Sequence, residues 1–244
     1  MKILTVLKTA MAATIGALLL ASCASSSRAV LGSLPPAPVE KIISVELITD
    51  NINLTEGTID YIHLGYNPQS PEGDANPTNY VRKAGVQEIL TPPQFPKMVW
   101  EVHDFNSYVN ANNPATNRSP RGEGAGISYT DGLFNGESVS AHGNTQAVST
   151  PDGPFVILVP ATATQRRLVL YVGAWNSTLE IEVSDGSGAT PEVVSHTHDG
   201  GDEDRIRMVN IDFSSDGDGM LVVRLLKAGG ENIAIAGYAL YDLM

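Results

Sequence analysis

The densest group of side chains that could bind a metal lies between residues 196 and 204. Its members are His196, His198, Asp199, Asp202, Glu203 and Asp204. Histidines two positions apart on a strand point the same way, so their imidazole nitrogens could converge on a transition metal. The carboxylates alone offer hard oxygen ligands, which suit a structural calcium ion. The segment also fits a solvated loop between two strands, and all three interpretations stay open here.

Two tryptophans, Trp100 and Trp175, are candidates for binding a sugar. A flat apolar ring stacks on the C–H face of a sugar, while carboxylate, amide or guanidinium groups pair with its hydroxyl groups. Trp175 directly follows a predicted strand and is expected at a loop tip, whereas Trp100 lies in an irregular stretch. The alternative for Trp175 is closure of the core at one end of a sandwich, because large aromatic side chains dominate core burial.

Catalysis by paired carboxylates is the other chemistry to consider. The candidate acids are Asp60, Glu101, Asp104 and Asp131. Glycoside hydrolysis needs two carboxyl groups about 5–5.5 Å or about 6.5–9.5 Å apart, and the spacing of these acids singles out no pair. The sequence contains neither Gly-x-Ser-x-Gly nor His-Glu-x-x-His. We therefore expect no enzymatic activity, with a glycoside hydrolase or lyase as the alternative.

The elements that must position these residues are short β-strands. Strand-like segments separated by turn residues occupy 41–47, 58–65, 127–130, 155–159, 167–173, 179–184, 206–213, 220–226 and 233–241. Apolar residues alternate with polar ones in 179–184, as in a half-buried antiparallel strand. Turns are expected at Asp131-Gly132 and at 184–188, and Pro160 is expected to end the strand before it. These patterns predict an all-β protein, a single antiparallel β-sandwich of the jelly-roll type.

The sandwich is expected to span residues 41–244 and to contain a long irregular insertion at about 67–124. That stretch includes Pro92-Pro93 and Asn112-Asn113-Pro114. A long irregular excursion in a compact β domain is either functional or a disordered insertion, and the sequence leaves both open.

The only cysteine, Cys23, follows Leu20-Ala21-Ser22 at the end of the apolar run 10–20, behind Lys2 and Lys8. This run is too short to span a bilayer, and its order of charged, apolar and small residues is that of a secretory signal. The segment resembles the lipobox of bacterial lipoproteins. The resemblance implies cleavage before Cys23 and lipidation of its thiol, for example with palmitate, and several acyl chains give stable anchoring. The alternative is an ordinary secretory signal with an unrelated cysteine.

Residues 1–22 are thus expected to be a lipoprotein signal peptide, and residues 23–40 a lipidated cysteine and flexible tether. Serines 25–27 and the Pro35–Pro38 cluster offer too few apolar groups for a core. Ala24 is not the aspartate associated with retention at the inner membrane, so an outer-membrane or cell-surface location is expected. A lipidated Cys23 also leaves no thiol for an internal disulfide.

The formal net charge of −12 excludes some partners. A negative surface repels phosphate groups and anionic lipid head groups, which argues against nucleic acid and against electrostatic binding to a bilayer. The lipid anchor is therefore the expected membrane contact.

Several short motifs follow one another in a recognisable order. They are Asp60-Tyr61-Ile62-His63-Leu64-Gly65, Arg82-Lys83-Ala84-Gly85, Tyr129-Thr130-Asp131-Gly132, Val159-Pro160-Ala161, Leu170-Tyr171-Val172-Gly173-Ala174-Trp175 and Val183-Ser184-Asp185-Gly186-Ser187. This order resembles a recurrent extracellular domain found beside or within bacterial carbohydrate-active and surface proteins. The resemblance implies a galactose-binding-domain-like jelly roll, the architecture of many carbohydrate-binding modules. The tryptophans usual on either side of the first histidine are Tyr61 and Leu64 here.

The resemblance also implies that five residues take part in ligand binding. They are His63, Arg82, Lys83, Tyr129 and Asp131. For Arg82 and Lys83 the alternative is a structural role, as an ion pair with Asp60 or a bond to a loop carbonyl.

We therefore expect a surface-anchored lipoprotein that binds a polysaccharide or oligosaccharide without catalysis. The alternative is a structural or adhesion lipoprotein that contacts a protein partner. Such a protein would show a large apolar patch or an exposed strand edge.

Overall fold

The computed structural model describes residues 38–47, 52–65, 80–86, 89–92, 101–104, 127–144, 146–150, 154–198 and 206–244. The chain divides into two units, residues 1–35 and 36–244, and every described residue belongs to the second. All regular elements among the described residues are strands. No helix in these ranges is long and apolar enough to cross a membrane. The expectation of an all-β fold is therefore confirmed.

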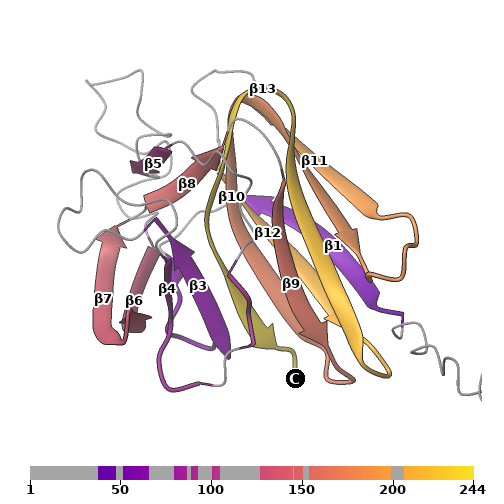
Figure 1. Cartoon of the computed structure of the whole chain (residues 1–244), viewed down its shortest axis with the longest axis horizontal. Coiled ribbons are helices and arrows are strands. Elements are labelled where there is room, and N and C mark those ends of the chain that lie inside the picture. Colours follow the sequence, from indigo (N-terminus) through magenta and orange to yellow (C-terminus); the bar gives the residue numbers. More distant parts are fainter. Residues whose placement is uncertain are drawn as a thin grey trace, which may run out of the picture. The chain divides into compact units, whose positions relative to one another are not determined.

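Thirteen strands occur in the described ranges (Figure 1). They are β1 Glu40–Leu47, β2 Ile52–Asn53, β3 Asp60–Leu64, β4 Tyr80–Lys83, β5 Glu101–Asp104, β6 Ile127–Phe134, β7 Glu137–Asn144, β8 Gln146–Thr150, β9 Phe155–Ala161, β10 Arg166–Ser184, β11 Glu192–His198, β12 Ile206–Ser214 and β13 Gly219–Asp242. Their pairings are antiparallel, except that β2 runs parallel to β6. Two of them, β4 and β5, lie inside the stretch expected to be irregular.

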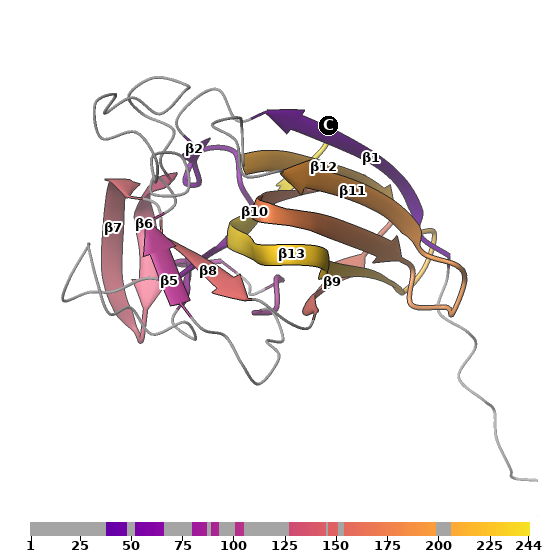
Figure 2. The same ribbon diagram turned by 90° about the horizontal axis from the view of Figure 1, so that it is seen from above.

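Two long strands, β10 and β13, organise the fold. They pair from Arg166 opposite Asp242 to Ser184 opposite Val222. Strands β12 and β3 flank one end of this ribbon, and β11 and β9 flank the other. The ribbon therefore contributes two strands to each of two layers. Figure 2 shows β1, β12, β10 and β13 side by side, as their pairing requires.

The ribbon is continuous where the sequence predicted separate strands at 167–173 and 179–184, and again at 220–226 and 233–241. Trp175 pairs with Asn232 inside β10, so its expected position at a loop tip is wrong. Pairing with β13 continues on both sides of Trp175, so β10 is not interrupted by a loop there. The Trp175 side chain lies outside the described part of the chain.

A corner bends the ribbon at Asn176. The core-facing residues of β10 are even-numbered up to Ala174 and odd-numbered from Leu179 onward. Asn176 has a φ of 46° and the register shifts between Thr178 and Leu179. Opposite it, a Cβ on Gly230 would lie 2.0 Å from the backbone oxygen of Asn176, so this close approach requires glycine. Bends of this kind let one strand pass from one layer to the other.

The main core lies between the two layers. Leu168, Leu170 and Val172 come from one half of β10, and Leu179, Ile181 and Val183 from the other, and all belong to one buried cluster with β9, β12 and β13. Each fully buried side chain of this size contributes roughly 1.5–3 kcal/mol relative to an exposed one. This shared core makes the curled sheet a β-sandwich.

A second hydrophobic cluster covers the opposite face of the β10–β13 ribbon. Here Val169 and Tyr171 of β10 and three alanines of β13 pack against Tyr61 and Tyr129. The small alanine side chains leave room for the tyrosine rings. This outer cluster, as we call it, is what holds β3 and β6 where the candidate site forms.

The turn expected at Asp131-Gly132 is not there. Strand β6 runs through both residues to Phe134, and the turn into β7 is Asn135-Gly136, with φ of 51° and 86°. Positive φ at both central residues is the geometry that Asn-Gly favours in hairpins. At Asp131 the register with β7 shifts between Tyr129 and Gly132, so β6 carries one extra residue. The Asp-Gly signal therefore marks a β-bulge.

Strand β9 does not stop at Pro160 but continues to Ala161. Among the described residues β9 pairs with β13 on one side only. Proline is tolerated at such an edge because the hydrogen bond it cannot donate would point away from the sheet. The turn expected at 184–188 is confirmed, since it separates β10 from β11, and a second turn separates β12 from β13.

Candidate functional site

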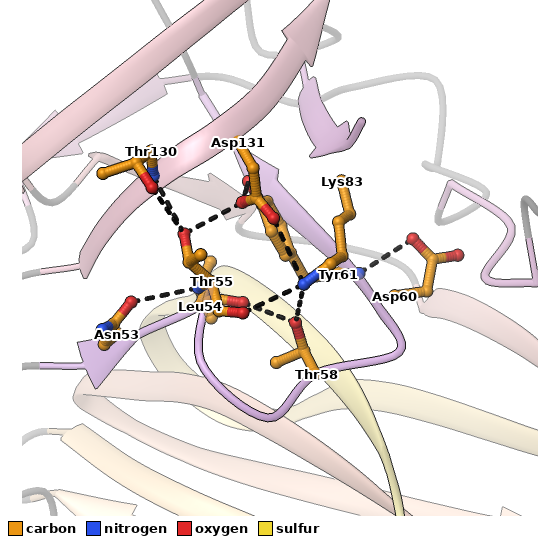
Figure 3. Close-up of polar contacts among 9 residues, drawn as sticks. All are labelled: Asn53, Leu54, Thr55, Thr58, Asp60, Tyr61, Lys83, Thr130 and Asp131. Carbon is orange, nitrogen blue, oxygen red and sulfur yellow. Dashed lines mark hydrogen bonds and ion pairs between the residues drawn. The ribbon is translucent and has the colours of Figure 1, made fainter. Parts of the chain in front are cut away.

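Three distant segments bring polar side chains together at one edge of the outer cluster (Figure 3). The Asp131 carboxylate of the β6 bulge accepts hydrogen bonds from the Thr55 hydroxyl at 2.9 Å and the Tyr61 hydroxyl at 3.0 Å. The Lys83 ammonium group lies 3.2 Å from the other carboxylate oxygen. We call these four side chains the Asp131 cluster.

Lys83 has no hydrogen left for a ligand. Besides its ion pair with Asp131, its Nζ donates to the Thr55 carbonyl and to the Thr58 hydroxyl, both at 3.0 Å. An ammonium group has three hydrogens, and these three acceptors use them all. Lys83 thereby ties the segment 53–58 to β6, and its side chain is only 12 % exposed.

Asp131 keeps an unused acceptor position. A carboxylate offers about four lone-pair positions, two on each oxygen. Among the described residues, Oδ1 accepts from Thr55 and Tyr61, and Oδ2 accepts from Lys83 alone. The Asp131 side chain is 29 % exposed, so a donor from solvent or from a ligand can reach this carboxylate.

The same contacts fix the ionisation of Asp131. Partial burial raises the pKa of this carboxyl. Hydrogen bonds from Thr55, Tyr61 and Lys83, together with the positive charge of Lys83, lower the pKa by more than burial raises it. The net result is a pKa below the ordinary value of 3.8. Asp131 is therefore an ionised carboxylate with a fixed direction at neutral pH.

The bulge and its glycine decide where Asp131 points. A Cβ on Gly132 would lie 2.6 Å from Cγ1 of Val81 and 2.7 Å from Cε2 of Tyr129. Glycine lets β6 pack this closely on β4 and on the Tyr129 ring. Because a bulge re-aims the side chain beside it, the extra residue turns Asp131 toward Thr55 and Lys83.

The tyrosine rings of the outer cluster support the Asp131 cluster from below. The ring centroids of Tyr61 and Tyr129 lie 5.6 Å apart, and those of His63 and Tyr129 lie 5.5 Å apart. Burial, followed by the hydrogen bond to Asp131, raises the pKa of Tyr61 far above its ordinary value, so its hydroxyl stays a donor. The Lys83 ammonium also lies 5.9 Å from the Tyr61 ring centroid.

Asp60 and Arg82 form a separate, buried contact. The Asp60 carboxylate is fully buried and accepts the backbone N–H groups of Ile89 at 2.9 Å and Leu90 at 2.8 Å. Arg82 Nη2 lies 3.6 Å from Asp60 and donates to the Leu90 carbonyl at 3.0 Å. Arg82 thus has both partners of the structural alternative that the sequence offered, an ion pair with Asp60 and a backbone carbonyl.

The described segment 89–92 is held onto the sandwich by this contact and by two more. The Thr91 hydroxyl donates to the Leu158 carbonyl of β9 at 3.0 Å, and the Tyr238 hydroxyl of β13 donates to the Thr91 carbonyl. Burial raises the pKa of Tyr238 well above its ordinary value, which keeps this phenol a donor.

The five residues implied by the resemblance are divided by burial. His63, Arg82 and Tyr129 are 2 %, 8 % and 1 % exposed, so all three side chains are buried. Their expected role in ligand binding stays a prediction, and the described structure gives these three side chains little contact with solvent. Lys83 and Asp131 are partly exposed. In the contacts that the structure describes, Lys83 has used its three hydrogens, whereas Asp131 has one free acceptor position.

The structure adds residues that the sequence analysis did not select. Thr55 and Tyr61 complete the Asp131 cluster, and Thr58 accepts a hydrogen bond from its Lys83. The only local signal is the polar run at 53–58, in which the Asn53 side chain accepts the Thr55 N–H at 3.1 Å. Such a pattern indicates a turn and not a site.

The histidine pair is not in a loop. His196 and His198 lie on β11 with 8 % and 4 % of their surface exposed, and the Asn176 N–H donates to Nδ1 of His198 at 3.3 Å. They share a face, as their spacing predicted, but this face points into the sandwich. Asp199 and Asp202 lie outside the described residues, as do Trp100 and Cys23. Within the described ranges no three His, Cys, Asp or Glu side chains are grouped to hold a metal ion.

No family model matches this chain, and no curated protein matches it. Solved structures with slight similarity include CsCBM6-3 of Clostridium stercorarium in complex with cellobiose, at 16% identity over 41% of this chain and 77% of that chain with a TM-score of 0.28. TmCBM61 in complex with β-1,4-galactotriose gives 13% identity, 42% and 73% coverage and a TM-score of 0.25.

An exo-β-1,3-galactanase of Phanerochaete chrysosporium, solved with β-1,3-galactotriose, gives 15% identity, 41% and 24% coverage and a TM-score of 0.27. Likenesses at these scores are too slight to assign a family or a function to this chain. Its candidate site therefore has to be judged on its own geometry.

Proposed function

We propose that this chain is an exported, lipid-anchored protein that binds carbohydrate without changing it chemically. The observation that carries the proposal is the Asp131 carboxylate, which is ionised, held by three neighbours and 29 % exposed. A sugar presents many hydroxyl donors. A carboxylate that is already oriented pairs with one of them without losing further conformational freedom.

The surroundings of Asp131 suit the same kind of ligand. Thr130 beside it is exposed, and so are Asn53 and Glu56 of the adjoining segment. These side chains offer hydroxyl, amide and carboxylate groups for polar contacts. The Thr55 hydroxyl, which bridges Asp131 and the Thr130 N–H at 2.9 Å, holds the segment 53–58 against β6.

Binding without catalysis is supported by the state of Asp60. Asp60 and Asp131 were both candidates for a catalytic pair of carboxylates. Asp60 is fully buried and its oxygens accept the backbone N–H groups of Tyr61, Ile89 and Leu90. A general acid or base must reach the proton that it transfers, and Asp60 in this position does not reach a substrate in solvent.

The binding test is affinity electrophoresis and a glycan array with the full chain in detergent. We expect retardation by at least one neutral polysaccharide, with no reducing sugar released on long incubation. Release of reducing sugar would replace the proposal with a glycoside hydrolase. No binding by protein whose circular dichroism shows β-structure would overturn it.

The anchor is tested at Cys23, where the resemblance to a lipobox places the lipid. We expect the wild-type chain to incorporate labelled palmitate and to partition into membranes. The Cys23→Ala variant should do neither. Equal partitioning of both chains would show that the thiol carries no anchor.

The alternative function is contact with a protein partner, and one observation favours it. Strand β1 pairs only with β12 among the described residues, and its Ile42 and Val45 are 69% and 39% exposed. An open strand edge with exposed apolar side chains is a surface on which another chain can add a strand. Cross-linking through a photoreactive group at position 42 in intact cells would capture such a partner.

A further inference from the structure

The bonding positions left open in the Asp131 cluster determine which sugars it can accept. Lys83 donates its three ammonium hydrogens to Thr55, Thr58 and Asp131. The Tyr61 hydroxyl donates its only hydrogen to Asp131. The cluster therefore offers a ligand no cationic donor, although it contains a lysine.

The open position in the cluster is an acceptor. It lies on Oδ2 of Asp131, which has one bonded neighbour among the residues that the structure describes, where two fit. A hydroxyl group donates to such an oxygen, whereas a carboxylate or sulfate ester can only place a second negative charge against it.

The charge around this acceptor points the same way. Asp131 and the exposed Glu56 carry negative charge here, and Lys83 is the positive charge paired with Asp131. The whole chain has a formal net charge of −12. Like charges placed together across an interface weaken binding, so an anionic sugar meets repulsion both at this site and over the surface.

Resting on the proposed function, we infer that the Asp131 site binds a neutral sugar through a hydroxyl that donates to Asp131, and that it rejects uronic and sulfated sugars. Lys83 is a positioning residue in this scheme. It orients the carboxylate and the segment 53–58 and does not contact the ligand.

The test compares sugars that differ only at C6. Three neutral sugars are used with the full chain in detergent, namely cello-oligosaccharide, β-1,4-galactan and β-1,4-mannan, each beside its own C6-oxidised derivative. We expect the neutral member of the bound pair to bind at least about tenfold more tightly than the uronate. The difference should shrink between about 0.01 M and about 0.15 M salt, because the Debye length falls from roughly 30 Å to roughly 8 Å.

Variants distinguish this site from any other. Asp131→Asn should weaken binding of the neutral sugar at least tenfold. The matched control is Glu182→Gln, which removes a similarly exposed carboxylate from its 2.8 Å contact with Arg224 elsewhere on the sandwich, and it should bind as the wild type does. If Asp131→Asn does not fold, Glu56→Gln serves instead. It removes a negative charge beside the site and should reduce the preference for the neutral sugar.

Each outcome bears on one statement. Binding of a neutral sugar that neither Asp131→Asn nor Glu56→Gln alters would overturn this inference and leave the proposed function intact. Tighter binding of the uronate would do the same. No binding of any sugar in the panel would overturn both.

Discussion

The hydroxyl group of Tyr61 donates a hydrogen bond to the Asp131 carboxylate over 3.0 Å. Tyr61 is fully buried in the outer cluster, while Asp131 is 29 % exposed, so this contact connects the hydrophobic interior to a surface carboxylate. The tyrosine ring is held by its packing on Tyr129. The direction of the Asp131 carboxylate is therefore set by the core.

Replacing Asp131 with asparagine should destabilise the fold in a pH-dependent way. The pKa of Asp131 in the folded chain is below its ordinary value of 3.8, so the ionised carboxylate stabilises the folded state above that pH. This contribution is lost as the pH falls through the folded-state pKa. We expect Asp131→Asn to lower the free energy of unfolding by about 1 kcal/mol at neutral pH, given partial exposure. Urea unfolding at neutral pH and well below pH 3.8 checks this; an equal difference at both would contradict it.

Removing the Asp60 carboxylate should be far more costly than removing an exposed one. Asp60 is fully buried and faces Arg82 and three backbone N–H groups. Asp60→Ala removes the buried carboxylate that faces Arg82 and leaves three backbone N–H groups without their acceptor, and loss of one partner of a buried ion pair typically costs 3–5 kcal/mol. The matched control is Asp242→Ala, which breaks the exposed ion pair with Arg166 and should cost about 0–1 kcal/mol. Similar thermal midpoints for the two variants would show that the buried pair is not a structural contact.

The bulge glycine should not tolerate a methyl group. Gly132→Ala would push Cβ to 2.6 Å from Val81 and 2.7 Å from Tyr129, and overpacking of this kind costs typically 1–3 kcal/mol. Gly229→Ala is the control, because a Cβ there meets nothing within 4 Å and should change stability by less than about 0.5 kcal/mol. Chemical denaturation of both variants measures the difference. Equal stability would mean that β6 can shift away from β4 at no cost.

The corner of the ribbon should require glycine at position 230 of β13 but not at position 176 of β10. Gly230→Ala would bring Cβ to 2.0 Å from the backbone oxygen of Asn176, at a φ of 86°, and a backbone atom cannot turn aside as a side chain can. We expect loss of more than about 3 kcal/mol or failure to fold. Asn176→Gly relieves a positive φ but removes the 3.1 Å bond to Glu231, so its effect should stay within about 1 kcal/mol. Denaturation midpoints that are lower for Asn176→Gly than for Gly230→Ala would contradict this account.

Much of the strand content follows from local sequence. The alternation of Leu179, Ile181 and Val183 with polar neighbours predicted a half-buried strand, and these residues do face the core. The turn at 184–188 is equally local, since the Asp185 side chain accepts the Ser187 N–H at 2.9 Å. Patterns with a period of two, and turns closed by their own side chains, depend on neighbours in the chain and can be recognised without the fold.

Packing between strands decided where the hairpin turn between β6 and β7 lies. Asp131-Gly132 and Asn135-Gly136 are equivalent turn signals within four residues of each other. Val81 and Tyr129 pack closely on Gly132, and β6 continues past it. The chain turns instead at Asn135-Gly136. Local propensity cannot choose between the two because the neighbours that decide come from β4 and from the packing of the rings.

The candidate site shows the same division. The sequence by itself determined the all-β class, the polar character of Lys83 and Asp131, and the segments that carry them. Only the tertiary structure decided that Lys83 donates its hydrogens to Thr55, Thr58 and Asp131. It also buried His63 and Tyr129 and left Asp131 with one open acceptor position among the described contacts. Which hydrogen bonds a side chain makes, and how deeply it is buried, depend on the groups that surround it in the folded protein. Strand register brings those groups together, and contacts between distant parts of the chain set that register.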